Sequence, residues 1–166
     1  GHSALEANTT GANNVAVGKN ALVANTTASN NIAVGMNCLS ASTTGDNNVA
    51  MGSYAMDANT TGASNVGIGV HALGANTTAD ANIAIGEDSL KTCTTSTSNQ
   101  AIGTSALYSV TTGDGGNAVV GHQACYSATT AHSTAALGKY AGYALTTGTN
   151  NTFIGKDAGR TGSPGG

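Results

Sequence analysis

Charged residues are the first thing this sequence has little of. They make up 8% of the 166 residues, the formal net charge is −3, and the five Lys and Arg residues are scattered. Nucleic-acid-binding proteins usually carry a basic stripe or patch, so we expect no nucleic-acid partner. Disorder is another reading of so polar a chain, but disordered segments usually carry more charge and lack regularly spaced apolar positions.

Long hydrophobic runs and aromatic side chains are also missing or rare. No run of 18 apolar residues occurs, which argues against a membrane-spanning helix and against membrane contact by this segment. Aromatic residues make up 4% of the chain, and tryptophan is absent. Acidic residues are few and never clustered, so we expect no enzyme activity, no metal site and no other cofactor.

The abundant residues, Gly, Ala, Thr, Ser and Asn, are arranged in a repeat. The segment NVAVGKNALVANTTASN (14–30) is followed at once by NIAVGMNCLSASTTGDN. One glycine returns every 17 residues, with a single extra residue before Gly121, and a Thr-Thr pair returns in step. An internal period of this kind is typical of solenoid proteins. We assign the nine recurring glycines to turns: Gly18, Gly35, Gly52, Gly69, Gly86, Gly103, Gly121, Gly138 and Gly155.

Two apolar positions recur in each unit. A large apolar residue precedes each turn glycine and a small residue precedes that one, as in Ala16-Val17, which predicts a short strand. A second apolar position, Leu22 in the first unit, follows the glycine by four residues and predicts a second strand-like piece beyond a turn. We assign the large residues of the first position to the core: Val17, Val34, Met51, Ile68, Ile85, Ile102, Val120, Leu137 and Ile154.

Two short strands per unit, stacked unit on unit, predict an all-β parallel β-roll or β-solenoid. Helices are disfavoured because Thr, Asn and Gly fill the rest of each unit. We expect one repetitive domain over residues 3–159, cut from a longer fibre, and a flexible tail over 160–166. The asparagines that run from Asn14 to Asn151 at the start of each strand either bind a ligand or form a ladder of stacked amides, and the ladder is favoured.

Burial within one chain is expected to be insufficient. Two large apolar side chains per unit are few against the conformational entropy that seventeen ordered residues lose. A further face buried between chains would supply the difference, and the small side chains of the alanine column suit close approach of chains. The sequence therefore predicts a homo-oligomer, most simply a homotrimer around a long axis.

A column of tyrosines is the candidate binding surface. Tyr108, Tyr126, Tyr143 and Arg160 follow the second apolar position on consecutive units and are expected to point outward. Such a ladder either stacks sugars or stacks on itself, covering units in which Leu is replaced by Cys125 or glycine. The second reading is favoured.

The three cysteines fall at different positions of the repeat. Cys93 lies about three units from Cys38 and about two from Cys125, too far for a disulfide, so we expect free thiols. His122 lies three residues before Cys125, but no second ligand pair recurs, so a metal site or a Cys-His catalytic pair is disfavoured.

The repeat phrases resemble those of a known family. NNVAVGKNAL, NIAIGEDSL and NTFIGKDAG are similar to the head repeats of YadA-like trimeric autotransporter adhesins, and still more to related repeats in tail fibres of bacteriophages and other large viruses. The resemblance extends over residues 3–159. It implies a left-handed parallel β-roll and a homotrimer, displayed extracellularly on a virion tail fibre or the bacterial outer surface. It further implies attachment to a host cell-surface glycan or protein. The chain departs from the adhesin heads in its unit length and its Thr-Thr-Gly extension.

Ice binding is the alternative function. Flat β-solenoids with regularly spaced threonines can match an ice surface, and the low charge and nine Thr pairs agree with this. Adjacent threonines in a strand point to opposite faces, however, and Thr-Thr-Gly is typical of a turn. A fibre module is therefore preferred, and a polysaccharide lyase on a β-helix fits least because carboxylates are few.

Overall fold

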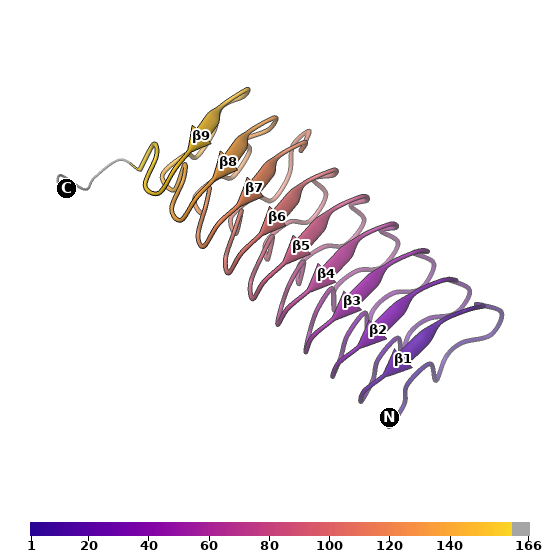
Figure 1. The fold of residues 1–166 in the computed structure, drawn as a ribbon. Helices are drawn as coiled ribbons and strands as arrows, with labels where there is room; N and C mark the ends of the chain where they lie inside the picture. The colour runs from indigo at the N-terminus through magenta and orange to yellow at the C-terminus, as the bar shows by residue number, and fades with distance from the viewer. Residues whose placement is uncertain (161–166) are drawn as a thin grey trace.

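The structure, a computed structural model that describes residues 1–160, is a parallel β-solenoid of about eight turns (Figure 1). The predicted all-β solenoid is confirmed, and the predicted tail lies outside the described residues except for Arg160. Each strand together with the segment that leads to the next one is called a rung here, and the rung takes the number of its strand. The nine strands, all in one sheet and in chain order, are β1 (Val15–Val17), β2 (Ile32–Val34), β3 (Val49–Met51), β4 (Val66–Ile68), β5 (Ile83–Ile85), β6 (Gln100–Ile102), β7 (Ala118–Val120), β8 (Ala135–Leu137) and β9 (Thr152–Ile154).

The strand register follows the repeat without a slip. Each residue pairs with the residue 17 positions later, as Ala33 does with Ala50. The single exception is the step from β6 to β7, where Ala101 pairs with Val119. The extra residue is taken up between Thr112 and Asn117 by three glycines with positive φ. Every rung therefore presents the same position of the repeat at the same place around the solenoid.

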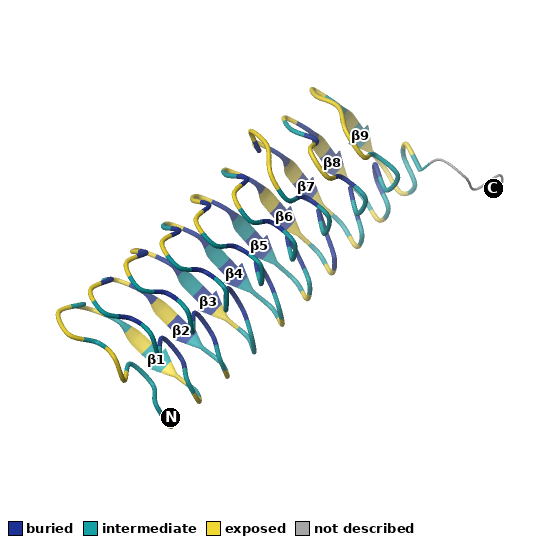
Figure 2. Cartoon of the chain, turned by 180° about the vertical axis from the view of Figure 1, so that it is seen from behind, coloured by how far each residue is buried: buried dark blue, intermediate teal, exposed yellow. Residues whose placement is uncertain are grey.

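Strand side chains alternate in the sense opposite to the expected one. The middle residue of each strand points inward, and Ala33, Ala50 and Ala84 are fully buried. The nine large residues assigned to the core point outward instead. They are half-buried, as Val34 is, or exposed, as Ile154 is at 63%. The exposed and half-buried strand positions follow one another along the rod (Figure 2). That assignment is wrong for this chain, and the alanine column is not free for contact between chains. A three-residue strand points one side chain in and two out, and the interior opposite a buried leucine leaves room mostly for a small one.

The second apolar position lies in turns, so the predicted second strand is wrong. Leu22 and Leu73 both have φ of 52°. The Gly74 amide donates to the His71 carbonyl at 3.1 Å, closing a turn with positive φ at its third residue, as in type II turns. The Leu73 amide donates to the Ser89 carbonyl of the next rung at 3.0 Å. Turns can thus stack into a wall that needs no strand.

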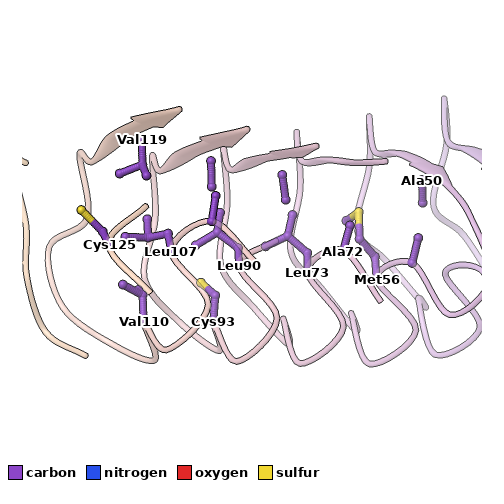
Figure 3. Close-up of a cluster of buried hydrophobic side chains, with 14 of the residues drawn as sticks. Ala50, Met56, Ala72, Leu73, Leu90, Cys93, Leu107, Val110, Val119 and Cys125 are labelled. Atoms are coloured by element: carbon purple, nitrogen blue, oxygen red, sulfur yellow. The ribbon is translucent and has the colours of Figure 1, made fainter. Parts of the chain in front are cut away.

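The core forms between the strand sheet and the stacked turns, which are called here the turn wall. Buried leucines of the turn wall lie in a row along the rod and face the strands (Figure 3). Sizes compensate across the interior: a Cβ on Gly67 would lie 2.8 Å from Cγ of Met56, the one methionine in the leucine series. Fully buried members of the turn wall are Leu22, Leu39, Met56, Leu73, Leu90, Leu107 and Cys125.

The C-terminal rungs show the same compensation in reverse. Gly142 and Gly159 replace leucine, and Phe153 replaces the strand alanine. A Cβ on Gly142 would lie 2.9 Å from Cδ2 of Phe153, so the phenyl ring occupies the space that leucine fills elsewhere. The expectation that tyrosines cover these rungs is therefore wrong.

The asparagine ladder is confirmed. Oδ1 of Asn48 accepts a hydrogen bond from the Asn65 amide at 2.9 Å, and Nδ2 of Asn65 donates to the Ala79 carbonyl at 2.8 Å. Both asparagines are fully buried. At the one break in the column, the Thr134 amide still donates to Oδ1 of the preceding rung's asparagine. These amides satisfy backbone groups at a buried corner, where an unpaired group would be costly.

Candidate functional site

The outward side chains of the nine strands form an apolar surface, called here the outer sheet face. Two side chains of each strand point outward, and they repeat from rung to rung in register. Its exposed members include Val15 (47%), Val17 (56%) and Leu137 (52%). The strands that present it are arranged side by side along the whole rod (Figure 1).

The two columns of the outer sheet face differ in composition. The column next to the turn glycines holds a large apolar residue in all nine rungs, from Val17 to Ile154. The other column is Val or Ile in β1–β5 and then changes to Gln100, Ala118, Ala135 and Thr152. The apolar surface is therefore widest over the first five rungs and narrows to one column beyond them.

The size of this face is that of an interaction surface. Three residues per strand and nine strands give a face roughly 10 Å wide and roughly 40 Å long. Its apolar part, which narrows to one column beyond β5, measures on the order of a few hundred Å², and apolar patches of this size on soluble proteins are often functional.

The tyrosine column exists and stacks on itself. The Tyr108 and Tyr126 ring centroids lie 4.9 Å apart and the Tyr126 and Tyr143 centroids 5.4 Å apart, with the planes 17° and 10° from parallel. Lys91 Nζ lies 5.8 Å from the Tyr108 centroid, and Arg160 Cζ lies 5.7 Å from that of Tyr143. Neighbouring rings and two cations thus cover the ring faces, leaving the ring edges and hydroxyls for a ligand. Stacking of sugars on these faces is not supported.

A basic column next to the tyrosines is missed by the sequence reasoning. His122, Lys139 and Lys156 each follow a turn glycine on consecutive rungs, and all three are exposed. Lys139 Nζ lies 4.9 Å from the ring centroid of Tyr140, and Arg160 Cζ lies 4.2 Å from it. The signal was present in the alignment of units, one position after the glycine. These three residues are called the basic column below.

Acid–base pairs hold several surface side chains in place. A hydrogen bond from Arg160, 2.9 Å from Nη1 to Oδ1, lowers the pKa of Asp157. A hydrogen bond to Asp88 raises the pKa of Lys91, whose Nζ lies 2.9 Å from Oδ1. Burial raises the pKa of Asp57, partly opposed by a backbone hydrogen bond and by nearby His71. The Asp88–Lys91 and Asp157–Arg160 pairs each join residues three apart in one rung and fix those side chains.

The cysteines form no reactive site. All three are free and buried, and burial raises the pKa of Cys38 and Cys125 to about 12 and that of Cys93 to about 11. Cys125 is fully buried whereas His122 is exposed, so thiol and imidazole point to different sides of the wall. Within residues 1–160 no three His, Cys, Asp or Glu side chains gather as metal ligands would.

The two threonines of each pair play different parts. Most of the first threonines donate a hydroxyl to the carbonyl of the next rung, as Thr60 does to Thr77 at 2.9 Å. The second threonines are all exposed and form a single file: Thr10, Thr27, Thr44, Thr61, Thr78, Thr95, Thr112, Thr130 and Thr147.

None of the described residues belongs to a helix that is long and apolar enough to span a bilayer. No protein-family model, curated protein or solved structure matches this chain.

Proposed function

We propose that this chain is a structural and attachment module of an extracellular homotrimeric fibre, in which solenoids associate side by side through their outer sheet faces. The fibre is of the left-handed β-roll type that the repeat phrases resemble, as in phage or virus tail fibres and bacterial surface adhesins. It presents its remaining surfaces to a host cell-surface glycan or protein. Multivalent display along a rod strengthens such attachment without new contacts.

The continuous outer sheet face is the observation that carries this proposal. Its large apolar column persists through nine rungs although those side chains, such as Val17 and Ile154, lie outside the chain's own core. A partner that covers the face must offer apolar contacts at the rung spacing of about 4.8 Å over the whole rod. A second copy of the same solenoid meets this requirement, because its repeat is identical.

The expected number of three chains comes from the resemblance to trimeric fibres, whereas the outer sheet face is chosen as the interface because its apolar side chains are exposed. The composition of its two columns indicates where each lies in the interface. The uniformly large column suits the centre of an interface, and the column that ends in Gln100 and Thr152 suits its rim, since interface cores are apolar and rims polar.

Sedimentation equilibrium across a wide dilution range tests the proposal. The expected mass is close to three chains of 16.0 kDa. The triple variant Met51→Thr, Ile102→Thr, Val120→Thr removes three side chains that are 41–42% exposed and is expected to be a folded monomer. The matched control Thr44→Ser, Thr61→Ser, Thr78→Ser changes three exposed side chains on the threonine file and should remain a trimer. A monomeric parent protein would contradict the proposal.

Ice binding is a second candidate, favoured by the exposed file of nine threonines at one position of the repeat. Inhibition of ice recrystallisation by the parent protein, lost in Thr61→Tyr and retained in Met51→Thr, would support it. No inhibition by the parent protein would remove this candidate.

A further inference from the structure

Charge is distributed unevenly along the rod. Residues 1–90 contain one of the five basic and six of the eight acidic residues, and residues 91–166 contain the other four and two. The first part therefore carries 1 − 6 = −5 and the second 4 − 2 = +2, which sums to the net charge of −3. The cationic side chains thus lie towards the C-terminal rungs of an acidic protein.

The basic column is the centre of this positive region. His122, Lys139 and Lys156 occupy one position on rungs 7, 8 and 9, so their backbones lie about one rung spacing apart. Lys139 and Lys156 are like charges on neighbouring rungs, and like charges this close repel each other. Earlier rungs avoid the arrangement, with Ser53 and Val70 among the residues at the same position. Lys139, Lys156 and Arg160 outnumber the one carboxylate beside them, Asp157, whose Oδ2 lies 3.5 Å from Lys156 Nζ. This row of cations fits a partner whose negative charges also repeat along the rod axis.

The neighbouring side chains are positioned for the same partner. Arg160 is held by Asp157 and lies over the Tyr140 ring, as described above, so its guanidinium is fixed with further N–H groups to donate. The Tyr140 and Tyr143 rings meet edge to face with centroids 5.7 Å apart. Tyrosine hydroxyls beside a row of cations can bond to hydroxyl groups of a ligand.

We infer that rungs 7–9 bind a linear acidic polysaccharide that runs along the solenoid axis. Its carboxylate or sulfate groups pair with Lys139, Lys156 and Arg160, and its hydroxyls contact the tyrosine edges. This inference rests on the proposed attachment function and names the ligand class for it.

Nucleic acid, the other common linear polyanion, fits less well. Proteins that bind single strands stack bases on free aromatic faces. Here the Tyr126 ring lies between Tyr108 and Tyr143, and the Tyr140 ring has Lys139 and Arg160 over it.

Binding of the full chain to immobilised heparin, hyaluronan, neutral dextran and an oligothymidylate tests the inference. Heparin and hyaluronan should bind, whereas dextran and the oligonucleotide should not. Lys139→Gln with Lys156→Gln should weaken binding at least about tenfold, and the matching arginine pair should restore it. Lys19→Gln changes the same position on rung 1 and should stay within about twofold of the parent.

Other results would overturn the inference: no binding to either acidic polysaccharide, tighter binding of the oligonucleotide, or an equal loss in Lys19→Gln. Sedimentation of the same samples keeps the two proposals distinct. A trimer that does not bind acidic polysaccharides would contradict the polysaccharide site but not the fibre proposal. A monomer that binds them would contradict the fibre proposal but not the polysaccharide site.

Discussion

The glycine after each strand is constrained in two independent ways. Its φ lies between 113° and 145° in the nine turns, in a region that is almost closed to other residues. Its α-carbon also lies close to the next rung, since a Cβ on Gly52 would be 2.6 Å from the Gly69 carbonyl oxygen. The last of these glycines, Gly155, has no atom within 4 Å of its missing Cβ.

These two constraints can be separated by alanine substitution. Gly155→Ala should cost about 1–3 kcal/mol, the price of its backbone conformation alone. Gly52→Ala should cost at least about 2 kcal/mol more, because the contact with the next rung adds to the same backbone term. Guanidinium unfolding followed by circular dichroism gives both values, and equal losses would contradict the role assigned to the contact.

The buried thiols predict a pH dependence. Burial raises the pKa of Cys38 from 9.0 to about 12, so the folded chain keeps a proton that the unfolded chain releases. The contribution of the protonated Cys38 thiol to the free energy of unfolding is fully present below pH 9.0 and is lost as the pH rises towards about 12. Between about pH 7 and about pH 10.5, the free energy of unfolding should fall more in the parent than in Cys38→Ala. Alanine occupies this position in Ala21 and Ala55. Equal slopes would contradict the expectation.

At the scale of elements, the strands were easier to predict than the direction of their side chains. The repeat and the Ala-Val alternation place β1 correctly, because a strand needs only a period of two and turn residues at its ends. Alternation does not say which face is inside. The larger size of Val17 favours placing it inside and Ala16 outside, which is wrong. The buried Leu22 side chain leaves room inside only for the smaller residue. The sequence also predicts a strand at Leu22, because the positive φ that this leucine adopts has no signature in sequence.

Size compensation between the two walls predicts a coupled pair of substitutions. Gly67→Ala should cost about 1–3 kcal/mol because its methyl group would meet Cγ of Met56 at 2.8 Å. Met56→Leu alone should cost about 1 kcal/mol. The double variant recreates the pairing of Leu73 with Ala84 and should lie within about 0.5 kcal/mol of the parent. Additive losses in denaturant unfolding would contradict the pairing.

At the scale of the molecule, the tyrosine ladder was predictable and the apolar face was not. Stacking of Tyr108 on Tyr126 follows from their shared position on consecutive rungs. The outer sheet face depends on the outward direction of the side chains of Val17 and its equivalents, which only the structure shows. The basic column falls between these cases: the repeat aligns His122 with Lys139, but their exposure comes from the structure.

A rod of equivalent rungs should survive the loss of one whole rung. Deletion of residues 53–69 joins Gly52 to Val70 and removes Met56 together with its partner Gly67, so every remaining pair is kept. The shortened chain should give an unchanged circular dichroism spectrum per residue and a cooperative transition, because the stability of repeat arrays is nearly a sum over neighbours. Deletion of residues 53–68 leaves one extra residue directly after Gly52, outside the glycine-rich loop that takes up the extra residue between β6 and β7, and should lower the free energy of unfolding more than deletion of 53–69. A deletion of 53–69 that fails to fold would contradict this equivalence.

The constant offset of the strand register also bears on how the chain folds. Each strand finds its partner 17 or 18 residues away, and this distance does not grow with the number of rungs. The entropy lost in closing each loop is therefore the same for the first rung and the last. Relative contact order falls as the rod lengthens, so slow pairing of distant segments never limits the reaction. Once one rung has formed, its open edge templates the next, and a chain emerging from the ribosome can add rungs while its remainder is still being made.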